Sequence, residues 1–291
     1  MAEGSNHDWI GVAQPVRVTP LSPDITEAYA KATDDTNPRY FGEDALAPPM
    51  ASVIGMIPDS VFALLNQEEF IGRRERLVKL LHGDEDIRWF NPIRATDSLH
   101  MQSTVVDIED KSVGEIMTVE TLVNNAEREH LATHLTTLVI RDPKPAEQRV
   151  RSERTLRVEP AIRADPTGES IAASWTVSAD QSVRYAEASR DRNPIHLDDT
   201  VAAKAGLRGR ILHGLCTMAF AQRVVIDRLA DGDPRRLRRL RVRFSKPVYM
   251  GDTLTCRLLP VAIADHYRVS VENQDGVAVL RDGVAEVESI S

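Results

Sequence analysis

An internal repeat limits the folds open to this chain. Residues Tyr29 to Tyr40 read Y-A-K-A-T-D-D-T-N-P-R-Y, and residues Tyr185 to His196 read Y-A-E-A-S-R-D-R-N-P-I-H, 156 positions further on. Extended back to Ser22 and Ser178, the two copies share eight of seventeen aligned residues as far as the proline. Such a repeat indicates that one structural unit has been duplicated. Only the second copy ends in histidine, so the two units are expected to differ in chemistry.

A second pair of matching segments lies downstream at almost the same spacing. The segment from Pro92 to Leu99 (P-I-R-A-T-D-S-L) aligns with Pro247 to Leu254 (P-V-Y-M-G-D-T-L), 155 positions apart. Between the two copies, residues 142–154 carry two prolines and no apolar periodicity, which is typical of a linker. We therefore predict domains at 1–141 and 156–291, joined by a linker at 142–155.

Each copy is predicted to contain a short helix, a loop, a long helix and several strands. Ser22 and Ser178 stand where the N-caps of the short helices are expected. In the second copy, Gly214 to Leu229 has helical spacing and ends before D-G-D-P. Alternating apolar residues predict strands at 86–90, 99–106, 115–123, 130–141, 239–244, 253–259, 266–272 and 276–282. This order of elements predicts an α+β fold in which an antiparallel sheet curls around a helix.

Composition is that of an ordinary globular protein and excludes some classes of function. The chain is 42% hydrophobic and 27% charged, and its net charge of −8 argues against nucleic-acid binding. The first eight residues lack the basic region and apolar run of a signal peptide, and no apolar run approaches the roughly 20 residues that span a bilayer. Cys216 and Cys256 form neither a zinc motif nor a disulfide framework. We expect a cytoplasmic protein with reduced thiols and no membrane contact.

Asp191 and His196 are the candidate acid/base pair. Asn-Pro lies between them, and the proline ends the preceding helix, so the chain can turn and bring both side chains toward one point. Histidine titrates near neutral pH, so it can take a proton from a shared water or return it. This spacing therefore favours proton chemistry in the second copy.

Gly214 supplies a third candidate, at the start of the long helix in I-L-H-G. The first amides of a helix have no internal partner and carry the positive end of its dipole. Glycine leaves space for an oxygen to approach the backbone. Together these features predict an oxyanion hole for an enolate, so the three residues indicate proton transfer beside a carbonyl.

The segments Y-A-E-A-S-R-D-R-N-P-I-H-L-D and G-R-I-L-H-G-L-C-T-M-A resemble the signature of the MaoC-like, R-specific enoyl-CoA hydratase family of hot-dog folds. The resemblance implies a double hot dog: an α+β fold with two antiparallel sheets, each wrapped around a long central helix. It also implies a carbon–oxygen lyase, a hydratase or dehydratase that interconverts 2-enoyl and (3R)-3-hydroxyacyl thioesters in fatty acid metabolism.

The same resemblance implies roles for individual residues. Asp191 and His196 would hold and activate the water, and the Gly214 amide would bind the thioester oxygen. Asn193 would support the loop and the water. The substrate is expected to be an acyl thioester of coenzyme A, and no metal or further cofactor is implied.

The first copy resembles the non-catalytic partner domain of this superfamily. Tyr40 replaces the histidine, and Pro48-Pro49-Met50 stands where His-Gly is expected. We therefore predict an inactive first half that shapes the acyl pocket, with a helix from about Val53 to Leu65 lining it.

Three other groups of residues allow more than one interpretation. Arg239, Arg241 and Arg243 lie in the only dense basic run, either as a solvated strand face or as contacts for CoA phosphates. His130 and His134 could suggest a metal, but their β-branched context indicates a strand, in which they would stand roughly 13 Å apart. His213 is expected to be structural.

Several alternatives stay open from the sequence. The thioester could be carried by an acyl carrier protein, as in polyketide or fatty-acid assembly. Hydrolysis of a thioester, or thioester binding without catalysis, ranks below hydration. The fused halves could act as a monomer with an internal pseudo-dimer, or two chains could form a homodimer.

Overall fold

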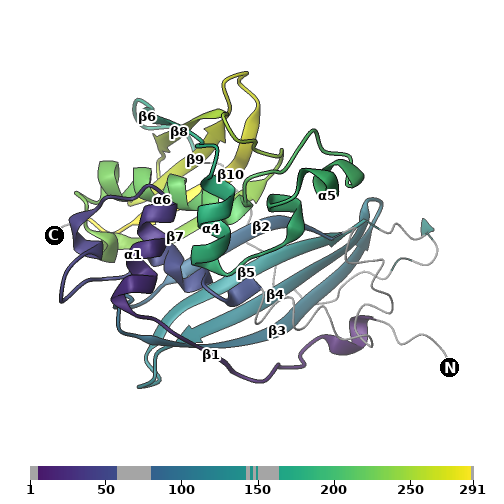
Figure 1. The fold of residues 1–291 in the computed structure, drawn as a ribbon, viewed down its shortest axis with the longest axis horizontal. Helices are drawn as coiled ribbons and strands as arrows, with labels where there is room; N and C mark the ends of the chain where they lie inside the picture. The colour runs from purple at the N-terminus through teal and green to yellow at the C-terminus, as the bar shows by residue number, and fades with distance from the viewer. Residues whose placement is uncertain (1–5, 58–79, 142–144, 147–148, 150–163, 290–291) are drawn as a thin grey trace.

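One antiparallel sheet runs through both halves of the molecule. The computed structural model describes residues 6–57, 80–141, 145–146, 149 and 164–289. Within them, ten strands are ordered β1-β3-β4-β5-β2-β7-β10-β9-β8-β6. They are β1 (Arg17–Pro20), β2 (Leu80–Trp89), β3 (Ser98–Lys111), β4 (Gly114–Asn124), β5 (His130–Ile140), β6 (Ile171–Thr176), β7 (Leu237–Phe244), β8 (Thr253–Pro260), β9 (His266–Glu272) and β10 (Ala278–Val287). The first half contributes the first five strands and the second half the last five (Figure 1).

The prediction of two separate sheets is wrong. Strand β2 of the first half pairs with β7 of the second, in a register that runs from Asp84 opposite Arg243 to Arg88 opposite Arg239. An unpaired strand edge leaves a row of backbone donors and acceptors without partners. The two halves remove one such edge from each other, so their strands form a continuous sheet.

The eight predicted strands are present, and two short strands were missed. Strands β1 and β6 lie at the two outer edges of the sheet. Each is short, and β1 ends in Pro20, a residue that an edge strand tolerates because the missing N–H breaks no ladder. Neither segment is long enough to show a clear period of two.

The basic run lies in the join between the halves. The Arg239 guanidinium makes two hydrogen bonds to Asp86, at 2.8 and 2.6 Å, and both side chains are about 96% buried. Arg241 and Arg243 both pair with Asp84 at 3.1 Å. Neither a solvated strand face nor contact with CoA phosphates fits Arg239 and Arg241, because both are buried against first-half carboxylates. Arg243 remains partly exposed while bonded to Asp84.

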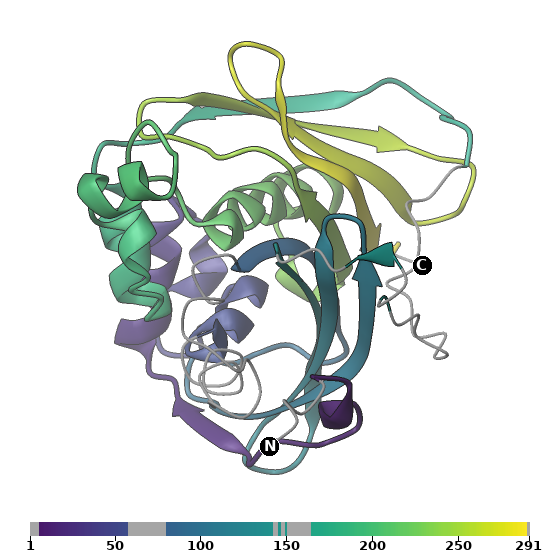
Figure 2. The ribbon, with the colours of Figure 1, turned by 90° about the vertical axis from the view of Figure 1, so that its right-hand side faces the viewer.

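The two short helices pack side by side across the join, as Figures 1 and 2 show. Helix α1 (Pro23–Ala32) has the predicted N-cap, since Ser22 Oγ accepts from the Ile25 amide at 3.4 Å. Helix α4 (Gln181–Ser189) has Asp180 at its N-cap position, so the prediction of Ser178 as its N-cap is wrong. The Ser178 hydroxyl instead contacts the side chains of Asp180 and Gln181.

The long helix α6 (Gly214–Leu229) has the predicted bounds and lies on the inner face of the curved sheet, against β7, β8 and β10 (Figure 2). The other described helices are α5 (Asp199–Lys204) and five 3-10 turns: η1 (Asn6–Trp9), η2 (Pro38–Tyr40), η3 (Pro49–Val53), η7 (Pro194–His196) and η8 (Pro234–Arg236). Most of the helix predicted from Val53, and most of the linker, lie outside the described residues. None of the described helices is long and apolar enough to cross a membrane.

Candidate active site

The chain turns sharply between the end of α4 and His196. Arg190 has a left-handed backbone, with φ of 65°, which ends the helix. Asn193 then holds the turn from two sides: its amide donates to Asp191 Oδ1 and its Oδ1 accepts from the Ile195 amide, both at 3.2 Å. The turn places His196 at the end of η7. Asn193 therefore supports the loop through hydrogen bonds within it.

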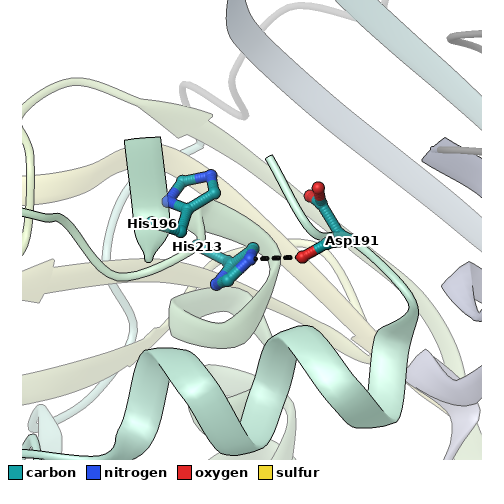
Figure 3. Close-up of side chains that lie close together, drawn as sticks. All are labelled: Asp191, His196 and His213. Carbon is teal, nitrogen blue, oxygen red and sulfur yellow. Dashed lines mark hydrogen bonds between the residues drawn. The ribbon is translucent and has the colours of Figure 1, made fainter. Parts of the chain in front are cut away.

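This turn brings Asp191 and His196 together, with His213 beside them (Figure 3). One polar atom from each of the three residues lies within 4.8 Å of the others. Two groups at that separation can share one water, since each hydrogen bond to the water spans about 2.8 Å. The pair that the sequence singled out is thus close enough to act on one water molecule.

One ring nitrogen of His196 is hydrogen bonded to the backbone, and the other can act on a substrate or water. Its Nδ1–H donates to the Ile211 carbonyl at 3.0 Å, so in the neutral ring Nε2 carries the lone pair. Burial lowers the pKa of His196 from its usual 6.5, although the charge of Asp191 opposes this shift. At neutral pH the imidazole is therefore a base that can accept a proton at Nε2.

His213 holds both members of the pair. Its Nε2–H donates to the backbone carbonyl of Asp191 at 2.9 Å, and its ring stacks on His196 with centroids 3.8 Å apart (Figure 3). Burial, and then the charge that His196 can carry, hold the pKa of His213 well below 6.5. His213 is 2% exposed, and its Nδ1 has no hydrogen-bond partner in the described part of the chain. A neutral ring in this place orients Asp191 and His196.

The same three residues belong to the types that bind zinc, but their arrangement favours a water. A metal lies in the plane of an imidazole along the nitrogen lone pair. The rings of His196 and His213 are stacked only 28° from parallel, so their lone pairs run side by side instead of converging. His213 Nε2 is also already a donor to a carbonyl.

Gly214 is the first residue of α6, directly after His213. Its amide has no acceptor within the helix, as expected of a first-turn amide. A Cβ at this position would lie 2.9 Å from the ring of Phe244, so no larger residue fits without movement. Glycine is therefore required here by packing as well as by any oxygen that approaches the amide.

Two family models match the chain, one in each half. The MaoC like domain matches residues 163–279, and the FAS1-like dehydratase domain region matches residues 8–134. The match in the first half ends within β5, and the match in the second half ends within β10. The other described strands of each half are covered in full. The fold and the site therefore define a two-part MaoC-like protein.

Two curated relatives match over most of their lengths. A "3-hydroxyacyl-thioester dehydratase Y" of Mycobacterium tuberculosis is 34% identical over 71% of this chain and 72% of its own length. A "Probable enoyl-CoA hydratase 2" of Dictyostelium discoideum is 29% identical over 86% of this chain and 84% of its own. This chain belongs to the MaoC-like dehydratase family.

Solved structures show the same fold. The MaoC-like dehydratase of Phytophthora capsici superposes with a TM-score of 0.84 at 20% identity, covering 99% of this chain and all of that one. A Mycobacterium tuberculosis protein described as a double hotdog fold superposes with a TM-score of 0.62 at 14% identity, covering 98% of each chain. The fold is thus a double hot dog whose halves form an internal pseudo-dimer, joined here through β2 and β7.

Proposed function

We propose that this protein hydrates 2-enoyl-CoA thioesters to (3R)-3-hydroxyacyl-CoA thioesters and catalyses the reverse dehydration. The observation that carries the proposal is the pairing of Asp191 with a neutral His196 at a spacing that one water can bridge. The names of the two relatives, a hydratase and a thioester dehydratase, support the same class of reaction.

The geometry supports a simple account of hydration. His196 Nε2 takes a proton from the water as the water oxygen bonds to C3 of the enoyl group. The electrons of the C2–C3 double bond move toward the thioester, and the Gly214 amide stabilises the charge that develops on its oxygen. The Asp191–His196 pair then returns a proton to C2. Asp191 keeps its orientation through the amide of Asn193 and the ring of His213.

The test is loss of the enoyl chromophore when the purified chain is mixed with a short-chain 2-enoyl-CoA. Asp191→Asn and His196→Ala should each lower kcat by roughly 10²- to 10⁴-fold. Asp44→Asn and His100→Ala are matched controls: Asp44 is an exposed surface carboxyl, and His100 lies on β3 of the first half. Full activity in either site variant would refute these roles, and release of free thiol would indicate hydrolysis instead.

Dehydration of an intermediate bound to an acyl carrier protein is the second candidate. It is favoured by the match of residues 8–134 to a dehydratase region named for a fatty acid synthase. Rates on the same acyl group attached to CoA and to a carrier protein would separate the two. A kcat/KM much higher on the carrier-bound form would make carrier-protein chemistry the main reaction.

A further inference from the structure

A second group of buried ionisable side chains lies in the first half and includes neither Asp191 nor His196. Glu85 on β2 is fully buried and accepts three hydrogen bonds, each 2.9 Å long. The donors are His82 Nε2, His134 Nδ1 and the Thr136 hydroxyl. These four residues are called the Glu85 cluster below, and the reaction proposed above does not use them.

A β-bulge assembles the cluster on the inner face of the sheet. The pairing of β2 with β5 shifts register between His82 and Asp84. In a regular strand, residues three apart point to opposite faces, but the extra residue turns His82 to the same side as Glu85. Thr136 is the direct cross-strand partner of Glu85, and His134 lies two residues along on the same face. Ile87 and Leu138, which belong to the hydrophobic core, share that face.

Burying the cluster is costly, because its face of the sheet otherwise carries hydrophobic core residues and the neutral, hydrogen-bonded Ser103–Thr121 pair. Burial alone would raise the pKa of Glu85, but hydrogen bonds from His134 and His82 and their charges lower it to about 2. The carboxylate therefore stays charged although no part of it meets water. Replacing such a set by apolar residues is often neutral or stabilising, so packing alone does not explain it.

One polar atom of the cluster lacks a partner. His134 is 0% exposed, and its Nε2 makes no hydrogen bond with any described residue. Leaving a buried polar atom unpaired costs about 1–3 kcal/mol. Since Nδ1 is held by Glu85, the ring is fixed with Nε2 pointing away from the carboxylate. The atom is thus oriented in advance for a hydrogen-bonding group that the described residues do not provide.

The cluster lies close to the proposed thioester site. The Phe244 ring is the group that a side chain at Gly214 would strike. The Phe244 ring also packs against the His82 ring, with the ring centroids 4.6 Å apart. One aromatic ring therefore separates the start of α6 from the first member of the cluster, and His134 follows beyond Glu85.

We propose that the Glu85 cluster is a subsite for a hydroxyl group carried on the acyl chain of the substrate, with His134 Nε2 as its hydrogen-bond partner. A hydroxyl both donates and accepts, so it pairs with Nε2 whether the imidazole is neutral or charged. The inference rests on the proposed function and adds to it a preference for acyl groups with an oxygen substituent remote from the thioester.

The experiment compares pairs of 2-enoyl-CoA esters of equal chain length, with and without a terminal hydroxyl, over a series of medium and long chains. With the unmodified protein, kcat/KM should favour the hydroxylated ester by about tenfold at the chain lengths that reach His134. Preference for the plain ester at every length would overturn the subsite. Failure to turn over any enoyl ester, short ones included, would instead refute the proposed function.

Two variants connect the preference to His134. His134→Asn keeps an N–H near the position of Nδ1, and so a donor to Glu85, but removes Nε2; the preference should fall to about one. His130→Asn is the matched control on the same strand, where His130 contacts Asn124 and Thr133, and it should keep the preference. Because the readout is a ratio within one variant, a modest loss of folded protein does not disturb it. An undiminished ratio in His134→Asn would contradict the assignment.

Discussion

Asn37 and Asn193 occupy the same place in the two copies of the repeat and have nearly identical backbones. Their angles are φ −57°, ψ 121° and φ −57°, ψ 122°. Each asparagine amide donates to the aspartate two residues before it, and each side chain caps a 3-10 turn. The left-handed residue also recurs, at Asp34 and Arg190. Duplication has preserved the main chain of this turn.

In the first copy, the Asp35 and Tyr40 side chains of this turn are buried, and the backbone amide that corresponds to Gly214 is already hydrogen bonded. Tyr40 is fully buried, and its hydroxyl finds no partner among the described residues. Burial, together with the charge of Asp227, raises the pKa of Asp35 to about 6, against the lowering effect of the Asn37 amide. Met50, which stands where Gly214 stands in the second copy, has its amide hydrogen bonded to Gln222 Oε1 at 2.6 Å.

The groups that close the first turn come from the second half. Gln222 lies on α6, and the Asn37 amide group donates to the Gly232 carbonyl just beyond that helix at 2.8 Å. By contrast, Asn193 and its neighbours are exposed or half-buried. Loss of the site in the first copy is therefore more than loss of one histidine, because the amide at its helix start is already occupied.

The largest effect is expected when His196 in the second turn is replaced by tyrosine, the residue at the matching position of the first turn. His196→Tyr should lower kcat by roughly 10²- to 10⁴-fold, because it removes the base at Nε2. The protein should remain folded, since Tyr40 shows that this backbone accepts tyrosine. Enoyl hydration and a thermal melt would measure both. Near-normal kcat with an unchanged melt would mean that His196 is not the base.

The reverse exchange, Tyr40→His, should not create an active site in the first half. Tyr40→His in an Asp191→Asn background should stay as inactive as Asp191→Asn alone, because Gln222 still occupies the Met50 amide. The measurement is the same enoyl assay at high protein concentration. Recovered activity would show that a histidine at position 40 is sufficient for catalysis, and that the hydrogen bond from the Met50 amide to Gln222 does not prevent it.

His213 has no counterpart in the first copy, where Pro49 precedes Met50. His213→Leu should lower kcat about tenfold to a hundredfold with little change in KM, since it releases the Asp191 carbonyl and the stacked His196 ring. His213→Gln, whose amide can reach the position of Nε2, should recover part of the loss. Equal activity in the leucine variant and the original protein would assign His213 to packing alone.

The pH dependence of kcat/KM should reflect the environment of His196. The reaction needs the neutral ring, and burial lowers its pKa, so activity should persist as pH falls to 6.5 and decline only below that value. A pH profile with a fast short-chain substrate, or an NMR titration of the His196 ring, would measure the midpoint. A midpoint above 6.5 would contradict a lowered pKa of His196.

The smallest effect is expected at the closed turn. The pKa of Asp35 is 3.8 when unshifted and about 6 in the folded chain, so the unfolded chain releases this proton first. Stability should therefore fall as pH rises from about 4 to 6, and Asp35→Asn should recover about 3 kcal/mol at pH 8 but little at pH 4. Thermal melts at the two pH values measure this. Asp44→Asn, on the surface, should show no such difference.

Local patterns were enough to predict much of this protein. The repeat, the bounds of α6, eight strands and the convergence of Asp191 with His196 follow from periodicity, helix-ending prolines and spacing, which act between residues close in the chain. The family could be recognised from the same segments, because the turn and the helix start lie within 24 residues of each other.

Contacts between residues far apart in the chain were decided only in three dimensions. Pairing of β2 with β7 merged two expected sheets into one and buried Arg239 against Asp86, 153 residues away. The Glu85 cluster joins partners 49 and 51 residues apart through the pairing of β2 with β5. A strand edge pairs with the strand that the tertiary fold places beside it. A buried charge is paired with a group that can lie far away in the chain. Such contacts therefore follow from tertiary packing and not from local sequence.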